Sequence, residues 1–451
     1  MTSSKKAENI RDVIRYLQKF KDALVVIYLD DKTIGSPLFS SHIRDIAMLH
    51  QAGLKVVIIP GARTRIDEVL GDAKIEWTYK DNTRVTSDAA MPLVKMAAFD
   101  VTNTVMTSLA ANGITAVIGN WVRARAKGVL DGLDFGPAGE IDKLDTQSLK
   151  TVLTDGFIPI FPCIGWSLSG KPYNISSLQL AEQIAEYLQA EKLFYIIPQA
   201  EISKNLFTIP EHFGLSDEGC IPAMSISELD EFISVNRNSP KDDSKNSVQN
   251  SEEKEKMLFL LELSKKACTN GVRRSHILNG LSDGVIPCEI FSDLGSGTMI
   301  YTNNYGKIRE MTPEDIPGVL RLMRPFVKKG ILLPRTDSQL AAELKDFIVY
   351  ELDGGIKGCA ALHTFDDKQG EIAGLAVDES CSHIGIGPQI ISHLISRAKD
   401  YKLSSVFVLT TQTADWFENL GFFPDSINTL PEKRKNLWTP DRNSKLFRIV
   451  F

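Results

Sequence analysis

The sequence predicts an α/β protein of two domains, the first built on a mostly parallel sheet and the second smaller. Three observations support this prediction. The chain has 451 residues, which is more than a single hydrophobic core usually serves. Buried strands alternate with amphipathic helices over most of residues 9–300, as in parallel strands joined by helices. A new strand and helix then begin after a turn-rich stretch.

The elements of the first domain follow from apolar periodicity. Apolar residues recur on one face over residues 9–20, which predicts a helix. The apolar runs at 23–29 and 55–60 lack polar alternation, as in strands that are buried on both faces. Further strands are expected at 116–120, 158–165 and 275–278, and further helices at 41–50, from 83–90 onward and at 258–267.

Two stretches interrupt this pattern. Residues 236–256 contain almost no apolar side chain, so nothing offsets the entropy of ordering them, and we expect a flexible surface insertion. The turn-rich segment 299–306 is expected to be a linker. The sequence therefore predicts a first domain at 1–298 and a second at 307–451.

The stretch from Glu371 to Gly387 organises the second domain. It begins as an apolar strand and ends in a turn with two glycines, Gly385 and Gly387, before an amphipathic helix. Glycine lets a ligand approach the backbone, and the first N–H groups of a helix attract anions. The stretch predicts an anion site, although such glycine turns also occur merely as turns. Upstream, Thr312 with acidic residues after it is typical of a helix N-cap.

Composition limits the partners and the compartment. A net charge of −6 argues against nucleic acid as a partner, because phosphate binding needs a basic surface. No apolar run approaches the length of a membrane span, and the N-terminal residues lack a secretory signal, so no membrane is expected. The six cysteines show neither a CxxC pair nor metal-ligand spacing. We therefore expect reduced thiols in a cytoplasmic protein without a metal.

A second apolar strand at 404–411 and the following Asn-Leu-Gly-Phe segment complete a pattern that resembles the GNAT acetyltransferase family. In that family two parallel strands splay apart and acetyl-CoA lies in the gap, so the resemblance implies an α+β domain that uses acetyl-CoA as co-substrate. The implied cofactor-binding residues are Leu375, Ala376, Val377, Ser382, Gly385, Ile386, Gly387 and Phe417. Ser382 stands where the family usually has Arg or Gln, which leaves the backbone N–H groups to hold the pyrophosphate.

Residues 9–300 resemble the amino acid kinase fold, most closely its acetylglutamate kinase branch. This fold is an open, mostly parallel sheet between two layers of helices. The matching segments lie at 60–67, 84–86, 128–140, 173–175 and 294–300.

The phosphate-binding positions of that fold are replaced in this chain. Where the kinases carry a lysine and two glycines on the first strand, this chain has Tyr28, Asp30 and Asp31. A carboxylate pair repels phosphate, and tyrosine supplies no cation. An aspartate of the kinases is replaced by Leu178, and their nucleotide-binding Thr-Asp pair is replaced by Ile197 and Pro198. These losses argue against phosphoryl transfer.

A kinase-like domain followed by a GNAT domain resembles, end to end, the family of bacterial-type N-acetylglutamate synthases. The resemblance implies direct transfer of acetyl from acetyl-CoA to the α-amino group of L-glutamate, the first step of arginine biosynthesis. Glu371 would be the base for the α-ammonium, made more basic by apolar neighbours. Thr410 would donate to the leaving thiolate or to the oxyanion. The alternatives are a strand-end carboxylate that faces water and a threonine without catalytic duty.

The two carboxylates of glutamate need cationic partners, and guanidinium groups bind carboxylates through paired N–H bonds. The resemblance implies a substrate site that consists of Leu333, Arg335, Leu409, Arg442 and Ser444. Pro334 stands where many of these synthases have a second arginine, so one auxiliary charge is missing. Either arginine could instead be an exposed salt-bridge partner.

The same resemblance implies feedback regulation by L-arginine, bound between the N-terminal helix and the end of the first domain. The residues expected there are Tyr16, Glu289, Gly295, Gly297 and Thr298. The alternative is that Glu289 lies on the surface and the glycine loop is only a turn. Family members assemble through the kinase-like domain, so a homo-oligomer, often a hexamer, is expected.

Three other functions stay open at this point. Acetylglutamate kinase is disfavoured by the replaced phosphate positions. A non-catalytic regulatory protein that binds arginine and acetyl-CoA would explain Ser382, but it would not need Glu371, Thr410 and the two arginines together. An acetyltransferase for another amino acceptor, such as aspartate, would use much the same contacts.

Overall fold

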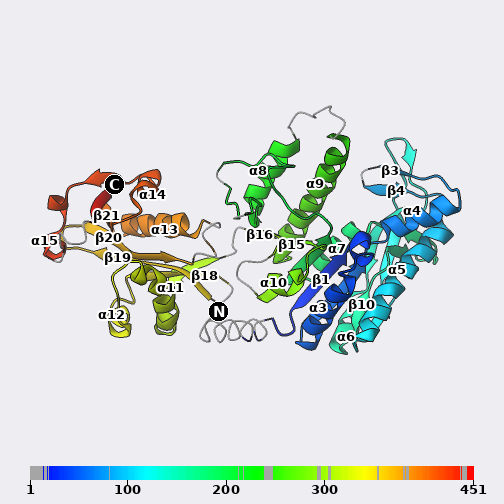
Figure 1. The fold of residues 1–451 in the computed structure, drawn as a ribbon, viewed down its shortest axis with the longest axis horizontal. Coiled ribbons are helices and arrows are strands. Elements are labelled where there is room, and N and C mark those ends of the chain that lie inside the picture. The colour runs from blue at the N-terminus through cyan, green and yellow to red at the C-terminus, as the bar shows by residue number, and fades with distance from the viewer. Residues whose placement is uncertain are drawn as a thin grey trace. The chain divides into compact units, whose positions relative to one another are not determined.

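The chain divides into two compact units, Met1–Asn303 and Asn304–Phe451. Each unit has its own sheets and its own hydrophobic core (Figure 1). The computed structural model describes residues 14, 18, 20–80, 82–211, 213–216, 218–237, 247–291, 296–302, 306–352, 355–378, 381, 385–436, 438 and 444–451.

The described part of the N-terminal unit is built on an eight-stranded sheet in the order β14-β16-β15-β13-β1-β2-β10-β5. Every neighbouring pair is parallel except β15 with β16, which confirms the predicted mostly parallel sheet. These strands are β1 (Leu24–Leu29), β2 (Lys55–Pro60), β5 (Ala116–Ile118), β10 (Ile158–Ile160), β13 (Lys192–Ile197), β14 (Ala223–Ser225), β15 (Arg274–Asn279) and β16 (Thr298–Tyr301).

Helices cover both faces of this sheet because the side chains of each strand alternate between two cores. On β1, Val25 and Ile27 pack into the cluster with α3, α5 and α10, whereas Val26 and Tyr28 pack into the cluster with α6, α7 and α9. The helices of this unit are α2 (Asp31–Ile34), α3 (Phe39–Gln51), α4 (Arg63–Asp72), α5 (Met91–Ala111), α6 (Thr146–Thr154), α7 (Ser177–Tyr187), α8 (Ile226–Arg237), α9 (Ser247–Thr269) and α10 (Val285–Phe291).

Shorter strands form three smaller sheets beside the main one. A four-stranded sheet has the order β12-β11-β6-β9, and β3–β4 and β7–β8 are two-stranded. Their bounds are β3 (Thr78–Lys80), β4 (Thr83–Val85), β6 (Val122–Ala126), β7 (Val129–Leu130), β8 (Leu133–Asp134), β9 (Gly139–Leu144), β11 (Ile164–Trp166) and β12 (Pro172–Asn174).

Four expectations for this unit are wrong in part. The segment 299–306, expected as a linker, begins with residues of β16, and the single strand expected at 158–165 is two strands, β10 and β11, in different sheets. Residues 83–85 form a strand, and the helix expected from there begins only at Met91. The segment 236–256, expected as a loop, is helical at both ends, because α8 continues to Arg237 and α9 begins at Ser247. Asn236 is buried and bonds the backbone of Thr208, and the Glu and Lys of α9 are strong helix formers. Residues 238–246 lie outside the described part.

The C-terminal unit contains a seven-stranded sheet in the order β17-β18-β19-β20-β21-β23-β22. Its described ladders are antiparallel except the central pair β20–β21, which is parallel. The strands are β17 (Lys307–Glu310), β18 (Phe347–Leu352), β19 (Gly355–Thr364), β20 (Gln369–Val377), β21 (Ser405–Thr410), β22 (Phe423–Asp425) and β23 (Lys445–Val450). This mixed sheet with helices confirms the predicted α+β unit.

The two faces of this sheet bury different helices. On β18, Phe347 and Val349 pack with α11 and α12, whereas Ile348 and Tyr350 pack with α13. The predicted N-cap at Thr312 is confirmed as a capping box with Asp315. The helices are η1 (Pro313–Asp315), α11 (Ile316–Lys328), α12 (Asp337–Ala342), α13 (Ile386–Asp400), α14 (Ala414–Asn419), η3 (Ile427–Thr429) and α15 (Glu432–Lys435).

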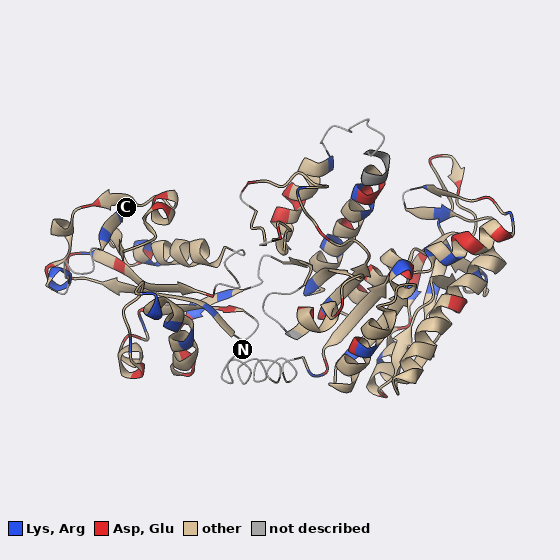
Figure 2. Ribbon diagram, viewed as in Figure 1, with Lys and Arg blue, Asp and Glu red and all other residues tan. Residues whose placement is uncertain are grey.

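The surface and the cysteines have ordinary features. Lys and Arg lie interspersed with Asp and Glu over both units (Figure 2). No helix in the described part of the chain combines the length and apolar character needed to cross a membrane. None of the six cysteines forms a disulfide bond.

Candidate active site

The parallel strands β20 and β21 pair over only part of their length. Their register runs from Gln369 opposite Ser405 to Ile372 opposite Val408, and β20 then continues to Val377 without a described partner on that side. Gly374 lies just beyond the last pair with a φ of 63°, where the register with β19 also shifts. A glycine bulge turns a strand and increases its twist, so β20 leaves β21 and a gap opens between them.

The predicted contacts to pantetheine lie along this gap. Ala376 is 1% exposed and packs on the α11 side of the sheet, while Leu375 and Val377 are half-buried. An extended chain can pair with a free strand edge through main-chain hydrogen bonds. The edge of β20 therefore fits the pantetheine arm of acetyl-CoA.

The predicted anion cradle lies at the start of α13. Gly385 is the N-cap residue, with a φ of 66°, and a Cβ placed on it would meet no atom within 4 Å. Ile386 is buried in the core, and a Cβ on Gly387 would lie 3.0 Å from the ring of Trp416. Helix N–H groups with an open glycine before them fit a pyrophosphate. Ser382 lies outside the described residues.

Phe417 was expected in the wall of the acetyl-CoA tunnel. It is 6% exposed and packs against the rings of Trp416 and Phe422, with centroid separations of 4.9 and 5.5 Å. These contacts place Phe417 in the core that supports α13. A contact with acetyl-CoA stays a prediction.

Glu371 lies on β20 beside the last residues that pair with β21. It is opposite His363 on β19 and opposite Phe407 on β21, and its side chain is 8% exposed. Arg434 of α15 binds the carboxylate at both oxygens, with Nε–Oε2 and Nη2–Oε1 distances of 2.6 and 3.0 Å. The alternative that the Glu371 carboxylate faces water is therefore excluded. The expectation that the neighbours of Glu371 are apolar is wrong in part, because they include the guanidinium of Arg434.

Thr410 is the last residue of β21 and is 8% exposed. Its Oγ1 accepts the N–H of Thr413 at 3.1 Å and lies 2.7 Å from the Thr413 hydroxyl. The backbone N–H occupies only one lone pair of the Thr410 oxygen. Its hydroxyl proton can therefore be donated to Thr413 or to a neighbouring thiolate.

Arg335 lies before α12 and is not an exposed salt-bridge residue. Its side chain is 17% exposed, forms an ion pair with Glu343, and stacks over Phe347 with the guanidinium carbon 5.0 Å from the ring centroid. Glu343 is also 3.9 Å from Nε2 of His363, whose Nδ1 is 2.7 Å from Asp346. This network links Arg335 to His363, the residue opposite Glu371. Sequence reasoning missed it, because its members come from three separate elements.

The other predicted substrate residues lie in different environments. Leu333 is 56% exposed. Leu409 packs beside the cluster of Phe407 and Leu446 on the sheet, and Ser444 is half-buried just before β23. Arg442 lies outside the described residues.

The predicted arginine site contains a buried polar network. Glu289 is 8% exposed, and its carboxylate accepts the N–H of Ser296 at 2.6 Å and lies 2.6 Å from Nδ1 of His276. Lys192 lies 3.5 Å from the other ring nitrogen of His276. Glu289 is therefore not a surface residue. Sequence reasoning missed Lys192 and His276, although both follow apolar strand patterns as polar exceptions.

Burial sets the charges of this network. Desolvation and the nearby Lys192 lower the pKa of His276 to about 4, so the imidazole is neutral at neutral pH. Its Nδ1–H then donates to Glu289, and Nε2 accepts from Lys192. Burial opposes the charge of Glu289, but His276 and the Ser296 N–H overcome this and lower its pKa to about 2. The carboxylate is thus ionised and already hydrogen-bonded.

Gly297 and Thr298, which were also predicted there, make close contacts within the N-terminal unit. A Cβ on Gly297 would lie 2.1 Å from the carbonyl oxygen of Ile277, so the close approach of β15 requires glycine. Thr298 is buried and donates to the carbonyl oxygen of Ile221 at 2.6 Å. Tyr16 and Gly295 lie outside the described residues.

The former phosphate region of the N-terminal unit is filled by its own side chains. The hydroxyl of Tyr28 donates to Asp30 at 3.3 Å, and a Cβ on Gly61 would lie only 2.7 Å from that hydroxyl. Burial and the adjacent Asp31 raise the pKa of Asp30 to about 6. Asp31 accepts the N–H of Thr64. The residues at the expected phosphate-binding positions are therefore a phenol and two carboxyl groups, which bond one another or the neighbouring backbone.

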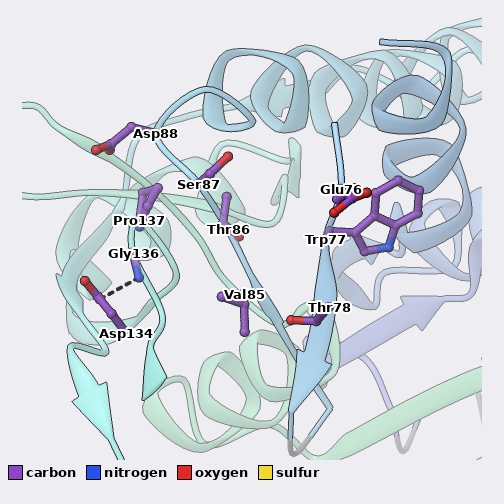
Figure 3. A pocket seen from close by; sticks show the side chains of 10 residues that line it. All are labelled: Glu76, Trp77, Thr78, Val85, Thr86, Ser87, Asp88, Asp134, Gly136 and Pro137. Carbon is purple, nitrogen blue, oxygen red and sulfur yellow. Dashed lines mark hydrogen bonds between the residues drawn. The ribbon is translucent and has the colours of Figure 1, made fainter. Parts of the chain in front are cut away.

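A pocket of about 400 Å³ opens nearby, between the β3–β4 hairpin and the loop after β8 (Figure 3). Its ten lining residues include Glu76, Asp88 and Asp134 but no lysine or arginine. Asp134 accepts the N–H of Gly136 at 2.9 Å, the bond that is dashed in Figure 3. This pocket is also unsuited to phosphate. In the described part of the chain, no group of His, Cys, Asp or Glu could hold a metal ion.

Comparisons with known proteins assign each of the two units to a known family. The Amino acid kinase family matches residues 28–279, and an acetyltransferase (GNAT) domain matches residues 343–424. The amino-acid acetyltransferase of Shewanella oneidensis is 32% identical to this chain over 98% of it and 97% of the relative. The amino-acid acetyltransferase of Yersinia pestis (strain Angola) is 31% identical over 98% of each chain.

Two solved structures of N-acetylglutamate synthase from Neisseria gonorrhoeae are similar to the whole chain. The structure with coenzyme A and L-arginine is 30% identical, with 99% of each chain covered and a TM-score of 0.77. The structure with coenzyme A and N-acetyl-glutamate is 30% identical, with 98% of this chain and 99% of the other covered and a TM-score of 0.60.

Fold and site define the class of this protein: it is a GNAT acetyltransferase whose catalytic unit is joined to an amino acid kinase-like unit. In the described part of the kinase-like unit, the positions expected to bind phosphate carry a phenol and two carboxyl groups, and in the GNAT unit β20 and β21 cease to pair after Ile372 and Val408. The chain belongs to the amino-acid acetyltransferase family. The predicted family, fold and enzyme class are therefore confirmed.

Proposed function

We propose that this chain is an N-acetylglutamate synthase, which transfers acetyl from acetyl-CoA to the α-amino group of L-glutamate. The observation that carries the proposal is the gap between β20 and β21, with Glu371 and Thr410 on its two strands. The full-length similarity to a synthase solved with coenzyme A and with N-acetyl-glutamate supports the choice of substrates.

The proposed reaction uses the residues of the gap in a fixed order. The backbone of Leu375, Ala376 and Val377 pairs with pantetheine, and the N–H groups at the start of α13 hold the pyrophosphate. Glu371 accepts a proton from the α-ammonium, so that the nitrogen lone pair can attack the thioester carbonyl. The C–S bond then breaks, and the thiolate, hydrogen-bonded by the hydroxyl of Thr410, takes the second proton that leaves the nitrogen as the amide forms.

Substrate glutamate is proposed to bind through its two carboxylates to Arg335 and Arg442, with Leu333, Leu409 and Ser444 around it. Arg335 already binds Glu343, so the substrate carboxylate must share or replace that partner. Paired N–H bonds make guanidinium suited to this exchange.

Regulation by L-arginine is proposed at the N-terminal unit. The ionised Glu289 is a fitting partner for a guanidinium or α-ammonium group, and the buried Lys192 lies next to its partner His276. A ligand would have to take over hydrogen bonds that His276 and Ser296 now make. The solved relative that holds L-arginine supports this proposal.

The units are proposed to divide the work: residues 1–298 regulate and assemble the protein, and residues 307–451 catalyse. Assembly as a homo-oligomer, a hexamer by resemblance, is checked by light scattering on the purified protein. A cytoplasmic location is proposed because none of the six cysteines forms a disulfide bond.

The experiment that tests the proposal is thiol release from acetyl-CoA by the purified chain. Glutamate and aspartate are compared as acceptors, each with and without arginine. Glutamate-dependent release that arginine suppresses would support both parts of the proposal. Release that arginine leaves unchanged would remove the regulatory part, and release with aspartate alone would change the substrate. No release with any acceptor would contradict the proposed function.

A further inference from the structure

The partner of the proposed base comes from a segment far away in the sequence. Arg434 belongs to the four-residue helix α15 and binds both carboxylate oxygens of Glu371, which lies 63 positions earlier. The two side chains are 19% and 8% exposed, so the pair is largely shielded from water. Two parallel N–H bonds fix the orientation of a carboxylate as well as its charge.

The segment that carries Arg434 is anchored on the same face of the sheet as Glu371. Leu430, just before α15, is 5% exposed and packs with Phe407 and Leu446. Phe407 is the residue opposite Glu371 in the β20–β21 register. The guanidinium is therefore held in place by packing and is not a mobile surface group.

The remaining charged groups around Glu371 already have partners of their own. His363 on β19 is bound to Asp346 at 2.7 Å, and Arg448 on β23 is bound to Asp425 at 2.5 Å. Arg335 is paired with Glu343.

The helices on both sides of the sheet add no further charge at this point. On α11, Arg321 and Arg324 are exposed to solvent. On α13, which covers the other face, His393 is exposed and the buried residues are apolar. In the described part of the chain, Arg434 is the cation that hydrogen-bonds Glu371.

We propose that Arg434 is the positioning residue of Glu371: its two parallel N–H bonds fix the orientation of the buried carboxylate for the incoming α-ammonium. Each carboxylate oxygen retains a lone pair beyond its bond to Arg434, so Glu371 can still bind the ammonium group. This inference rests on the proposed function, because it assigns Arg434 a duty in that same reaction.

The test compares the variants Arg434→Gln and Arg434→Lys with wild type by their kcat and KM in acetyl transfer to glutamate. Arg434→Gln should lower kcat/KM near neutral pH about 100-fold, chiefly through kcat, because the carboxylate is no longer held in one orientation. Arg434→Lys keeps a charge but loses the paired bonds, so the loss should be about tenfold. The KM for acetyl-CoA should stay unchanged in both variants.

Lys433→Met is the matched control. Lys433 is the neighbouring residue of α15, and its ion pair with Asp366 at 2.6 Å is exposed, with side-chain exposures of 76% and 87%. This variant should keep the wild-type kcat. A second measurement is a double-mutant cycle, in which Arg434→Gln should cost little once Glu371→Gln is present, because the two residues act as a unit.

Three results would overturn the inference. A raised KM for glutamate with an unchanged kcat would show that Arg434 binds the substrate directly. Wild-type kinetics in Arg434→Gln, or losses that are additive with Glu371→Gln, would show that the pair only supports the fold. If the wild-type protein transfers no acetyl group to glutamate, the proposed function fails, and the inference fails with it.

Discussion

The two units differ in the space and the charge around the residues near their strand ends. In the kinase-like unit, Tyr28 fills the space in front of Gly61, and Asp30 lies next to a carboxylate of the same charge. In the GNAT unit, the glycine before α13 is open, and Glu371 lies against a guanidinium. Both units keep well-buried cores. The buried core therefore maintains the fold, whereas the chemistry of each unit depends on a few positions near strand ends.

Among the changes that test this comparison, removal of the proposed base should have the largest effect on acetyl transfer. Glu371→Gln is expected to lower kcat for acetyl transfer by about 10²- to 10⁴-fold, because a general base contributes that much. The measurement is thiol release from acetyl-CoA with saturating glutamate. A variant that retains most of the wild-type rate would contradict the assignment of Glu371.

The buried histidine of the kinase-like unit should lower the stability of that unit at acidic pH. The pKa of His276 is lowered from 6.5 to about 4 in the folded state, so the unfolded state binds more protons between these values. The stability is full above about pH 6.5 and falls as the pH drops toward about 4, by on the order of 3 kcal/mol. The depressed pKa of Glu289, about 2, extends the loss at still lower pH.

Calorimetric unfolding at several pH values measures this effect. The variant His276→Asn keeps an N–H donor for Glu289 and does not titrate in this range, so its unfolding should depend less on pH. An unchanged pH dependence in this variant would contradict the neutral, buried histidine.

Substitution of Gly374, the glycine at the bulge of β20, should weaken the binding of acetyl-CoA. In Gly374→Ala, a Cβ would lie 3.3 Å from Phe347 at a φ of 63°, which costs about 1–2 kcal/mol. The KM for acetyl-CoA should rise about tenfold as β20 shifts toward β21.

A matched control distinguishes an effect on the gap between β20 and β21 from the general cost of backbone strain. Gly330 has a φ of 71° with no atom within 4 Å of its Cβ position, so Gly330→Ala carries a similar backbone cost away from β20. Equal changes in the KM for acetyl-CoA in both variants would contradict a specific role of the bulge.

The smallest effect is expected at the replaced phosphate site. The pKa of Asp30 is raised from 3.8 to about 6, so the folded state becomes less favourable as the pH rises through this range. Asp30→Asn removes the charge but can still cap α2 at Lys32, so the protein should gain about 1 kcal/mol near neutral pH. Thermal unfolding near pH 7 and pH 4 measures the gain, which should vanish at the lower pH. A large loss of acetyl transfer would contradict the view that this region has no catalytic duty.

Local patterns predicted much of the fold correctly. The apolar run at 55–60 coincides with β2, and Thr312 forms the expected capping box with Asp315. Such features depend on neighbours in the sequence, so periodicity and capping signals reveal them. The helical ends of the expected loop at 236–256 were missed, because their stability comes partly from Asn236 and its contact with Thr208, a distant residue.

Long-range pairing explains what was missed at the sites. Arg434 meets Glu371, and His276 meets Glu289, only after strands from different parts of the chain have been placed side by side. A charged side chain in a sequence does not show its partner, because the partner is chosen by the fold and not by spacing.

The sequence by itself determined the two units, the mostly parallel and mixed sheets, the glycine turn before α13 and the loss of the phosphate-binding positions. The two units, the mostly parallel sheet and the glycine turn follow from residue type and local periodicity, which act over a few residues, whereas the mixed sheet and the loss of the phosphate-binding positions were inferred from the resemblance to known families. Only the tertiary structure decided that β20 leaves β21 at Gly374, that Tyr28 fills the space at Gly61, and that Glu371 is held by Arg434. The physical reason is that burial and electrostatic partnership depend on contacts between residues far apart in the chain.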